Sequence, residues 1–192
     1  REEAPENLFG MGKNMGRSLR GQTLGLLGCG RIGKRTAEIA AALGMRCIGY
    51  SRHGVNHPQV ESVTLPELLA QSDVLSLHCP LTQETRRLLD RSALARMKQG
   101  SILINTARGA IVDCDALVDA LESGHLRGAG LDVYPDEPHI PPQLIMLPQV
   151  VLTPHIGTNT QETRLRMAEG CARQIADALA GKRPEHVVNG IE

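Results

Sequence analysis

Three closely spaced glycines constrain the fold of this chain more than any other feature of its sequence. They lie in the segment Leu24–Arg35, which reads LGLLGCGRIGKR, with the spacing Gly28-x-Gly30-x-x-Gly33. An apolar run precedes them, and a helical pattern over Lys34–Leu43 follows them. The segment therefore predicts a β-strand, a tight turn and an α-helix in immediate succession.

Each glycine of this turn has a role in holding a dinucleotide. Gly28 permits the tight turn, Gly30 lacks a Cβ and lets a pyrophosphate approach the backbone, and Gly33 allows the helix to pack closely on the strand. The positive N-terminus of the helix then faces the negative charge of the ligand. A glycine turn can also serve packing alone, but the flanking strand and helix favour a dinucleotide.

Beyond the glycines, short apolar runs alternate with helical patterns. This alternation predicts an α/β fold: a Rossmann-type, doubly wound parallel sheet with helices on both faces. The last helix is expected to begin at a threonine cap, Thr158 or Thr160, and to end at Gly181. The expected strands are Met45–Tyr50, Val74–Leu77, Ser101–Asn105, Gly128–Val133 and Val150–Leu152, and the expected helices are Leu65–Ala70, Asp90–Met97, Asp113–Glu122 and Gln161–Ala180.

The length of 192 residues and the hydrophobic content of 41% suit one domain with a substantial core. Residues 1–22 are polar and rich in glycine, so we expect a connecting segment that arrives from another part of the protein. Residues 23–157 are predicted to form the dinucleotide-binding domain. Residues 158–192 are predicted to form a C-terminal helix and tail that return toward a substrate domain.

Charge and composition argue against several classes of partner. The 21 basic and 21 acidic residues are dispersed and balance, and only 2% of the residues are aromatic, so neither nucleic acid nor a membrane is an expected partner. No apolar stretch has membrane-spanning length, and we expect no secretory leader. The five cysteines form no CxxC or Cys/His cluster, which predicts no metal site and favours a reducing, cytoplasmic location.

The end of the second expected strand bears on which dinucleotide is held. About 20 residues beyond such glycines, a carboxylate accepts hydrogen bonds from the ribose of NAD, whereas an arginine pairs with the 2′-phosphate of NADP. This chain has Tyr50-Ser51-Arg52-His53 there, without a carboxylate. Ser51 and Arg52 suit a phosphate, with His53 as a weaker assistant. NADP(H) is therefore favoured over NAD(H), although such an arginine is often a plain surface charge and some sites accept either cofactor.

Four further segments follow the later expected strands, where open α/β sheets bind their ligands. Together they resemble the D-2-hydroxyacid dehydrogenase family, specifically its nucleotide-binding domain, from about residue 19 to residue 189. The segments are His78-Cys79-Pro80-Leu81-Thr82, Asn105-Thr106-Ala107-Arg108-Gly109, Leu131-Asp132-Val133 with Asp136-Glu137-Pro138, and Thr153-Pro154-His155-Ile156-Gly157.

The resemblance implies an oxidoreductase that exchanges a hydride between a nicotinamide cofactor and a 2-oxo or 2-hydroxy acid. In the family pattern His155 matches the acid/base, and Arg108 matches the clamp that holds the carboxylate and polarises the carbonyl. Glu137 matches the carboxylate that fixes the tautomer of the histidine and favours imidazolium. Singly these are ordinary loop residues; in combination behind the glycine turn they favour the catalytic roles.

The same resemblance implies contacts to the cofactor along its whole length. Arg31 and Ile32 match positions at the pyrophosphate, Ser51 and Arg52 the adenosine end, and Cys79, Pro80 and Thr85 the middle. Thr106, Asp132 and Gly157 match positions near the nicotinamide, where Asp132 would bond the carboxamide. A homodimer is also implied.

One departure from the family pattern and two alternative functions remain open at this stage. Members of the family begin with a substrate-binding segment of roughly a hundred residues, the size of a small domain, that has no counterpart in this sequence, so we expect the chain to bind dinucleotide and turn over 2-oxo acids poorly by itself. Small acids such as glyoxylate or hydroxypyruvate are the favoured substrates, with phosphoglycerate oxidation as an alternative. The other alternative is a noncatalytic, dinucleotide-sensing corepressor, because the corepressor branch of this architecture keeps a triad similar to Arg108, Glu137 and His155.

Overall fold

The computed structural model describes residues 16–187. Of these, residues 16–154 form one compact unit, and residues 155–187 form a second. The strands are β1 (Thr23–Leu27), β2 (Arg46–Tyr50), β3 (Val60–Ser62), β4 (Val74–Leu77), β5 (Ser101–Asn105), β6 (Leu126–Leu131) and β7 (Val150–Leu152). The helices are α1 (Arg31–Ala42), α2 (Leu65–Gln71), α3 (Arg91–Arg96), α4 (Cys114–Glu122), α5 (Pro142–Met146) and α6 (Gln161–Leu179), with a 3-10 turn at Gly109–Ile111.

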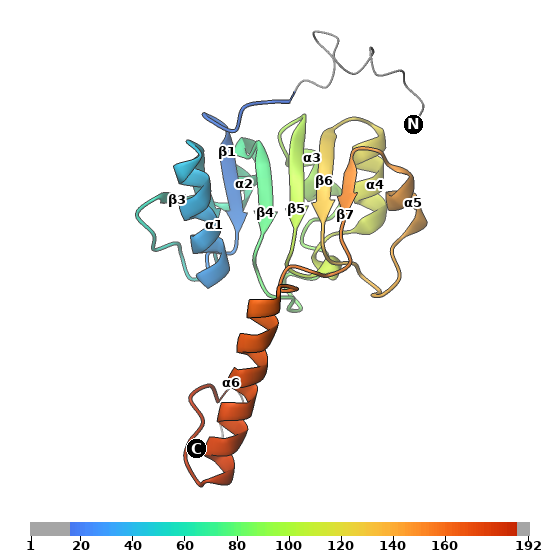
Figure 1. Ribbon diagram of the computed structural model, residues 1–192. Helices are drawn as coiled ribbons and strands as arrows, with labels where there is room; N and C mark the ends of the chain where they lie inside the picture. Colours follow the sequence, from blue (N-terminus) through green and yellow to red (C-terminus); the bar gives the residue numbers. More distant parts are fainter. Residues whose placement is uncertain (1–15, 188–192) are drawn as a thin grey trace, which may run out of the picture. The chain divides into compact units, whose positions relative to one another are not determined.

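The strands of the first unit form one parallel sheet in the order β3-β2-β1-β4-β5-β6-β7 (Figure 1). From β1 the chain moves outward through β2 to β3 and then crosses back, so that β4 pairs with the other side of β1. This reversal between β1 and β4 is a topological switch point, the place where sheets of this kind bind ligands. The predicted Rossmann-type parallel sheet is confirmed.

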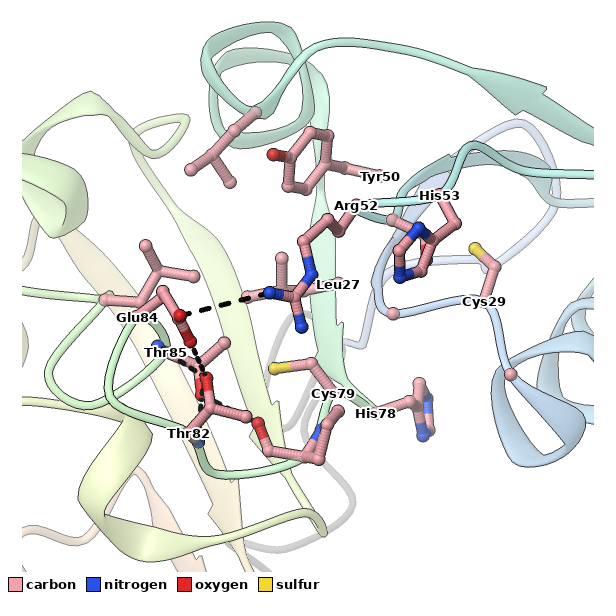
Figure 2. A pocket seen from close by; sticks show the side chains of 16 residues that line it. Leu27, Cys29, Tyr50, Arg52, His53, His78, Cys79, Thr82, Glu84 and Thr85 are labelled. Atoms are coloured by element: carbon pink, nitrogen blue, oxygen red, sulfur yellow. Dashed lines mark hydrogen bonds and ion pairs between the residues drawn. The ribbon is translucent and has the colours of Figure 1, made fainter.

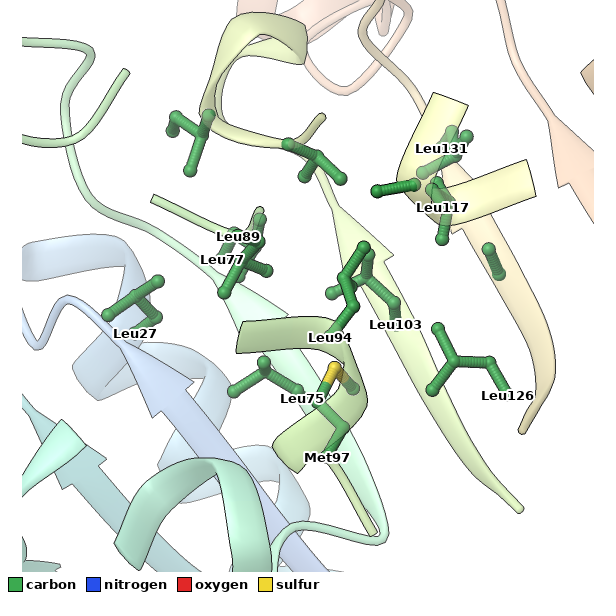
Figure 3. Close-up of a cluster of buried hydrophobic side chains, with 14 of the residues drawn as sticks. Leu27, Leu75, Leu77, Leu89, Leu94, Met97, Leu103, Leu117, Leu126 and Leu131 are labelled. Carbon is green, nitrogen blue, oxygen red and sulfur yellow. The ribbon is translucent and has the colours of Figure 1, made fainter. Parts of the chain in front are cut away.

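Buried side chains lie on both faces of the sheet, because successive residues of a strand point to opposite sides. Leu26 of β1 packs in a small cluster with Ala37 and Ala40 of α1. Leu27, the next residue, belongs to the larger cluster, which contains residues of α2, α3 and α4 (Figure 3). Helices therefore cover both faces, as predicted.

The observed elements differ from the expected ones mainly where an element is short. β3 was not expected because only Val60 of its three residues is buried. α5 was not expected either, because its five residues begin at a proline and bury only Leu144. β6 begins and ends two residues earlier than expected, at Leu126 and Leu131. Of the expected connecting segment, residues 16–22 contain neither strand nor helix, and residues 1–15 lie outside the described part.

The second unit contains α6, which begins where the sequence predicts. The side chain of Thr160 accepts a hydrogen bond from the Thr163 backbone N–H, and Gly181 follows the helix with a φ of +70°. These are the expected N-cap and stop. None of the side chains of α6 is buried within the described chain. In residues 16–187 no helix is both long enough and apolar enough to cross a membrane.

Candidate cofactor and active site

A cavity of about 440 Å³ opens at the carboxyl ends of β1, β2 and β4, at the switch point (Figure 2). Two backbone hydrogen bonds hold the three strand ends together. The Gly28 N–H donates to the Tyr50 carbonyl oxygen, and the His78 N–H donates to the Leu27 carbonyl oxygen, each at 2.8 Å. The lining comes from residues 27–30, 50–53 and 78–80, with Leu65, Thr82, Glu84, Thr85 and Leu88.

The glycines of the turn have different surroundings. Gly28 has a φ of +98°, and a Cβ there would lie 2.6 Å from the Cys79 backbone nitrogen. A Cβ on Gly33 would lie 2.3 Å from the Gly28 carbonyl oxygen, so the fold itself demands both glycines. A Cβ on Gly30 would meet no atom within 4 Å, apart from its chain neighbours, although Gly30 lines the cavity. Packing within the protein does not require Gly30, which leaves open space where a ligand can approach the backbone.

The N-terminus of α1 provides the positive end of a helix dipole beside this opening. Gly30 is the N-cap and has no side chain to occupy the first backbone N–H groups, and the first turn contains no acidic residue. Arg31 and Ile32 of that turn are exposed, with Ile32 at 71%, whereas Gly33 is buried. An anion such as a pyrophosphate fits this helix end.

Two charged side chains face each other in the lining of the cavity. Arg52, just after β2, has its Nη1 4.0 Å from Oε1 of Glu84, and both side chains are about two-thirds exposed (Figure 2). Ser51 and His53 lie beside Arg52 in the lining. Glu84 was missed in the sequence because it follows a different strand, β4, and only the strand order places it opposite Arg52.

The part of the wall formed by His78 and Cys79 carries little charge. Burial lowers the pKa of His78, so its imidazole is neutral at pH 7, and its Nε2 lies 2.9 Å from the Ser76 Oγ. Burial also raises the pKa of the Cys79 thiol, which keeps the thiol protonated and a poor nucleophile. This stretch of the wall is therefore suited to the uncharged parts of a ligand.

The predicted cofactor residues fall into three groups by their position in the fold. Thr106 and Asp132 follow β5 and β6, and Gly157 belongs to the second unit. Arg31, Ile32 and Gly33 form the first turn of α1. The remaining ones line the cavity: Gly28, Gly30, Ser51, Arg52, Cys79, Pro80 and Thr85.

Arg108 lies in the loop after β5, and a neighbouring amide shapes that loop. The side chain of the buried Asn105 donates to the Arg108 carbonyl oxygen and accepts from the Ala107 N–H, both at 3.0 Å. The guanidinium of Arg108 is exposed and donates to the Ala107 carbonyl oxygen at 2.6 Å. Asn105 therefore positions the candidate clamp, a role that its place at a strand end did not reveal.

Glu137 lies in the loop after β6, where the backbone holds its carboxylate. The Tyr134 N–H donates to Glu137 Oε1 at 3.0 Å. In the same loop, the buried Asp132 accepts a hydrogen bond from the Thr153 hydroxyl at 2.5 Å. The loop thus carries two carboxylates in defined positions.

His155 opens the second compact unit, whereas Arg108 and Glu137 belong to the first. Its φ of +53° lies in the left-handed region, which is uncommon for a residue with a side chain and several-fold enriched in histidine. The meeting of His155 with Arg108 and Glu137 stays a prediction. Within residues 16–187, no group of three or more His, Cys, Asp or Glu side chains is arranged to hold a metal ion.

Comparison with known proteins identifies the family. The family model for the NAD binding domain of D-isomer specific 2-hydroxyacid dehydrogenases matches residues 3–157. The chain belongs to this family. It is 48% identical over 180 residues to a glyoxylate reductase of Aeropyrum pernix, covering 91% of this chain and 54% of that protein. It is 41% identical over 178 residues to the D-3-phosphoglycerate dehydrogenase of Mycobacterium tuberculosis, covering 91% and 34%.

Two solved structures share this fold. The TT0316 protein of Thermus thermophilus is 48% identical with a TM-score of 0.86, over 98% of this chain and 58% of that one. An acyclic imino acid reductase, Bsp5, solved in complex with NADPH and D-Arg, is 34% identical with a TM-score of 0.86. The match covers 95% of this chain and 59% of that one. This dehydrogenase-family chain therefore spans about half the length of the first curated relatives and of these structures.

Several features of the cavity of this family member suit parts of a nicotinamide dinucleotide. The open space at Gly30 and the uncapped N-terminus of α1 suit the pyrophosphate. Arg52 offers a cation in the lining, and His78 and Cys79 form a neutral stretch of the wall. The chain is accordingly built to bind NAD(H) or NADP(H).

Proposed function

We propose that this chain is the cofactor-binding part of a reductase that converts a small 2-oxo acid, such as glyoxylate or hydroxypyruvate, into the 2-hydroxy acid. The observation that carries the proposal is the cavity at the β1–β4 switch point, opened at Gly30 beside the N-terminus of α1. The names of the glyoxylate reductases at 44–48% identity support the choice of substrate class. The bound nicotinamide would supply the hydride.

The substrate then needs a cation and a proton donor from the protein. The Arg108 guanidinium is exposed after β5, and its planar fork can meet two oxygens of a carboxylate and polarise the adjacent carbonyl. We assign His155 as the acid that protonates the developing alkoxide. Glu137, whose carboxylate is held by the Tyr134 N–H, would orient the imidazole and favour its protonated form.

For the cofactor we propose a preference for NADP(H). Arg52 and Ser51 line the adenosine end of the cavity, and β2 ends without a carboxylate. An arginine there can form charge-assisted hydrogen bonds with a 2′-phosphate. We also propose that the protein forms a homodimer. We further propose a reducing, cytoplasmic compartment, which the five free cysteines support.

The test is a steady-state assay of the full-length protein with glyoxylate and hydroxypyruvate, followed by the absorbance of NADPH. We expect His155→Ala to abolish turnover and to leave the affinity for NADPH unchanged. Full turnover by this variant would remove the acid/base assignment. Turnover of 3-phosphoglycerate without reduction of either 2-oxo acid would replace the proposed substrate.

A further inference from the structure

The carboxylate of Glu84 has a defined position in the lining of the cavity, beside Arg52. Thr82 Oγ1 donates to Glu84 Oε2 at 2.6 Å, whereas the Arg52 guanidinium lies nearest the other carboxylate oxygen, Oε1 (Figure 2). The turn itself is fixed, since the Thr85 hydroxyl donates to the Pro80 carbonyl oxygen and accepts from the Thr82 N–H, both at 2.7 Å. Glu84 is thus held in place toward Arg52.

Glu84 is also ionised at neutral pH. The hydrogen bond from Thr82 is the main cause that holds the pKa of this carboxyl below its usual value, with its own backbone N–H and the charge of Arg52 as further causes. The end of the cavity therefore carries one positive and one negative charge, which largely cancel for a ligand that approaches both.

The two nicotinamide dinucleotides differ at the point where this pair of charges would act. The 2′-phosphate of NADP(H) is an anion, so it is attracted by Arg52 and repelled by Glu84. The 2′-hydroxyl of NAD(H) is neutral and suffers no such repulsion, and a carboxylate can accept hydrogen bonds from ribose hydroxyls. The acid that is missing at the end of β2 is thus present across the cavity, after β4.

We infer that Glu84 is a cofactor-specificity residue that opposes the 2′-phosphate and so limits the preference for NADP(H) that Arg52 creates. This inference rests on the proposed function, since it assumes that the cavity holds the adenosine end of the cofactor. It adds a residue from the loop after β4 to the Ser51-Arg52 pair after β2.

The experiment measures the dissociation constants of NADPH and NADH for the full chain by titration calorimetry, in the wild type and in Glu84→Gln. We expect the preference for NADPH, measured as the ratio of the NADH to the NADPH dissociation constant, to be about two- to fivefold greater in the variant than in the wild type. This is the effect of removing one exposed charge–charge interaction. The gain should shrink as salt is raised, because exposed charges are screened. Glu84→Asp, which keeps the charge, should give a ratio close to that of the wild type.

The matched control is Glu61→Gln. Glu61 also forms an exposed ion pair with an arginine, Arg46, but neither residue lines the cavity. This variant should leave the ratio of the two dissociation constants unchanged. An unchanged or lowered NADPH preference in Glu84→Gln, or an equal gain in Glu61→Gln, would overturn the inference and leave the proposed function standing. Failure of the wild type to bind either nucleotide would instead overturn the proposed function.

Discussion

The Thr153 hydroxyl donates a 2.5 Å hydrogen bond to the carboxylate of Asp132, which is buried just after β6. Because Thr153 directly follows β7, this bond joins the carboxyl ends of two neighbouring strands. The buried Tyr134 strengthens the junction, since its phenol donates to the Thr153 carbonyl oxygen at 2.8 Å. A buried carboxylate thus depends on a donor from the next strand.

Replacing that donor should destabilise the fold. We expect Thr153→Val to lower the free energy of unfolding by about 1–3 kcal/mol, because a buried charged acceptor loses one of its hydrogen bonds. Urea unfolding at pH 7 measures the loss. Thr153→Ser keeps the hydroxyl and should retain most of the stability; equal losses in the two variants would mean that the hydrogen bond is not the cause.

Gly28 and Gly30 should respond differently to the same substitution. Gly28→Ala places a Cβ 2.6 Å from a backbone nitrogen at positive φ, so we expect a loss of about 2 kcal/mol or more in urea unfolding. Gly30→Ala meets no protein atom within 4 Å and should cost less than about 1 kcal/mol. Its effect should appear as weaker dinucleotide binding in calorimetry. Unchanged binding by Gly30→Ala would show that the open space at this position does not receive the ligand.

The elements of this fold that could be predicted from the sequence are those with a clear local hydrophobic pattern. β4 and β5 have the predicted bounds, because their apolar runs are buried and stand between clear helical patterns. β3 escaped prediction because it has only one apolar residue, Val60, and α5 because it begins at a proline and its five residues are too few to show a helical period. Among the strands the apolar run decides, and not the length of the element, since the three-residue β7 was predicted with its observed bounds from the run Val150–Leu152.

The sequence predicted which strand ends form the candidate site. It did not predict the contacts that their side chains make with one another or with the following loops. Arg52 was expected to pair with a phosphate of the cofactor at the end of β2, with no carboxylate beside it in that segment. Its pairing with Glu84 depends on β1 and β4 being neighbours, which no local pattern specifies. The contribution of Asn105 was hidden for a similar reason, since its partners are backbone atoms of the following loop.

Arg52→Ala tests the source of cofactor preference. Removing the guanidinium should weaken NADPH binding about tenfold relative to NADH, because a charge-assisted hydrogen bond to a phosphate is worth about 1.5–3 kcal/mol and part of it is offset by the nearby Glu84. Titration calorimetry with both nucleotides measures the ratio. Arg46→Ala, which removes an exposed arginine outside the cavity, is the control. Equal losses for NADPH and NADH in Arg52→Ala would contradict a role at the 2′-phosphate.

His78 gives the fold a dependence on pH through its position beside the glycine turn. The side chain is partly buried after β4, and this burial lowers the pKa of the imidazole in the folded chain. The unfolded chain binds the proton with the ordinary pKa of about 6.5, so it takes up more protons than the folded chain as the pH falls below that value. Stability must therefore decrease from about pH 6.5 downward and stop decreasing below the folded-state pKa.

His78→Gln should remove this part of the pH dependence. Between about pH 7 and pH 5, the free energy of unfolding of the wild type should fall more steeply than that of the variant, because only the wild type protonates this imidazole on unfolding. Urea titrations at several pH values measure both slopes. A pH dependence that is the same in wild type and His78→Gln would show that His78 is not the titrating group.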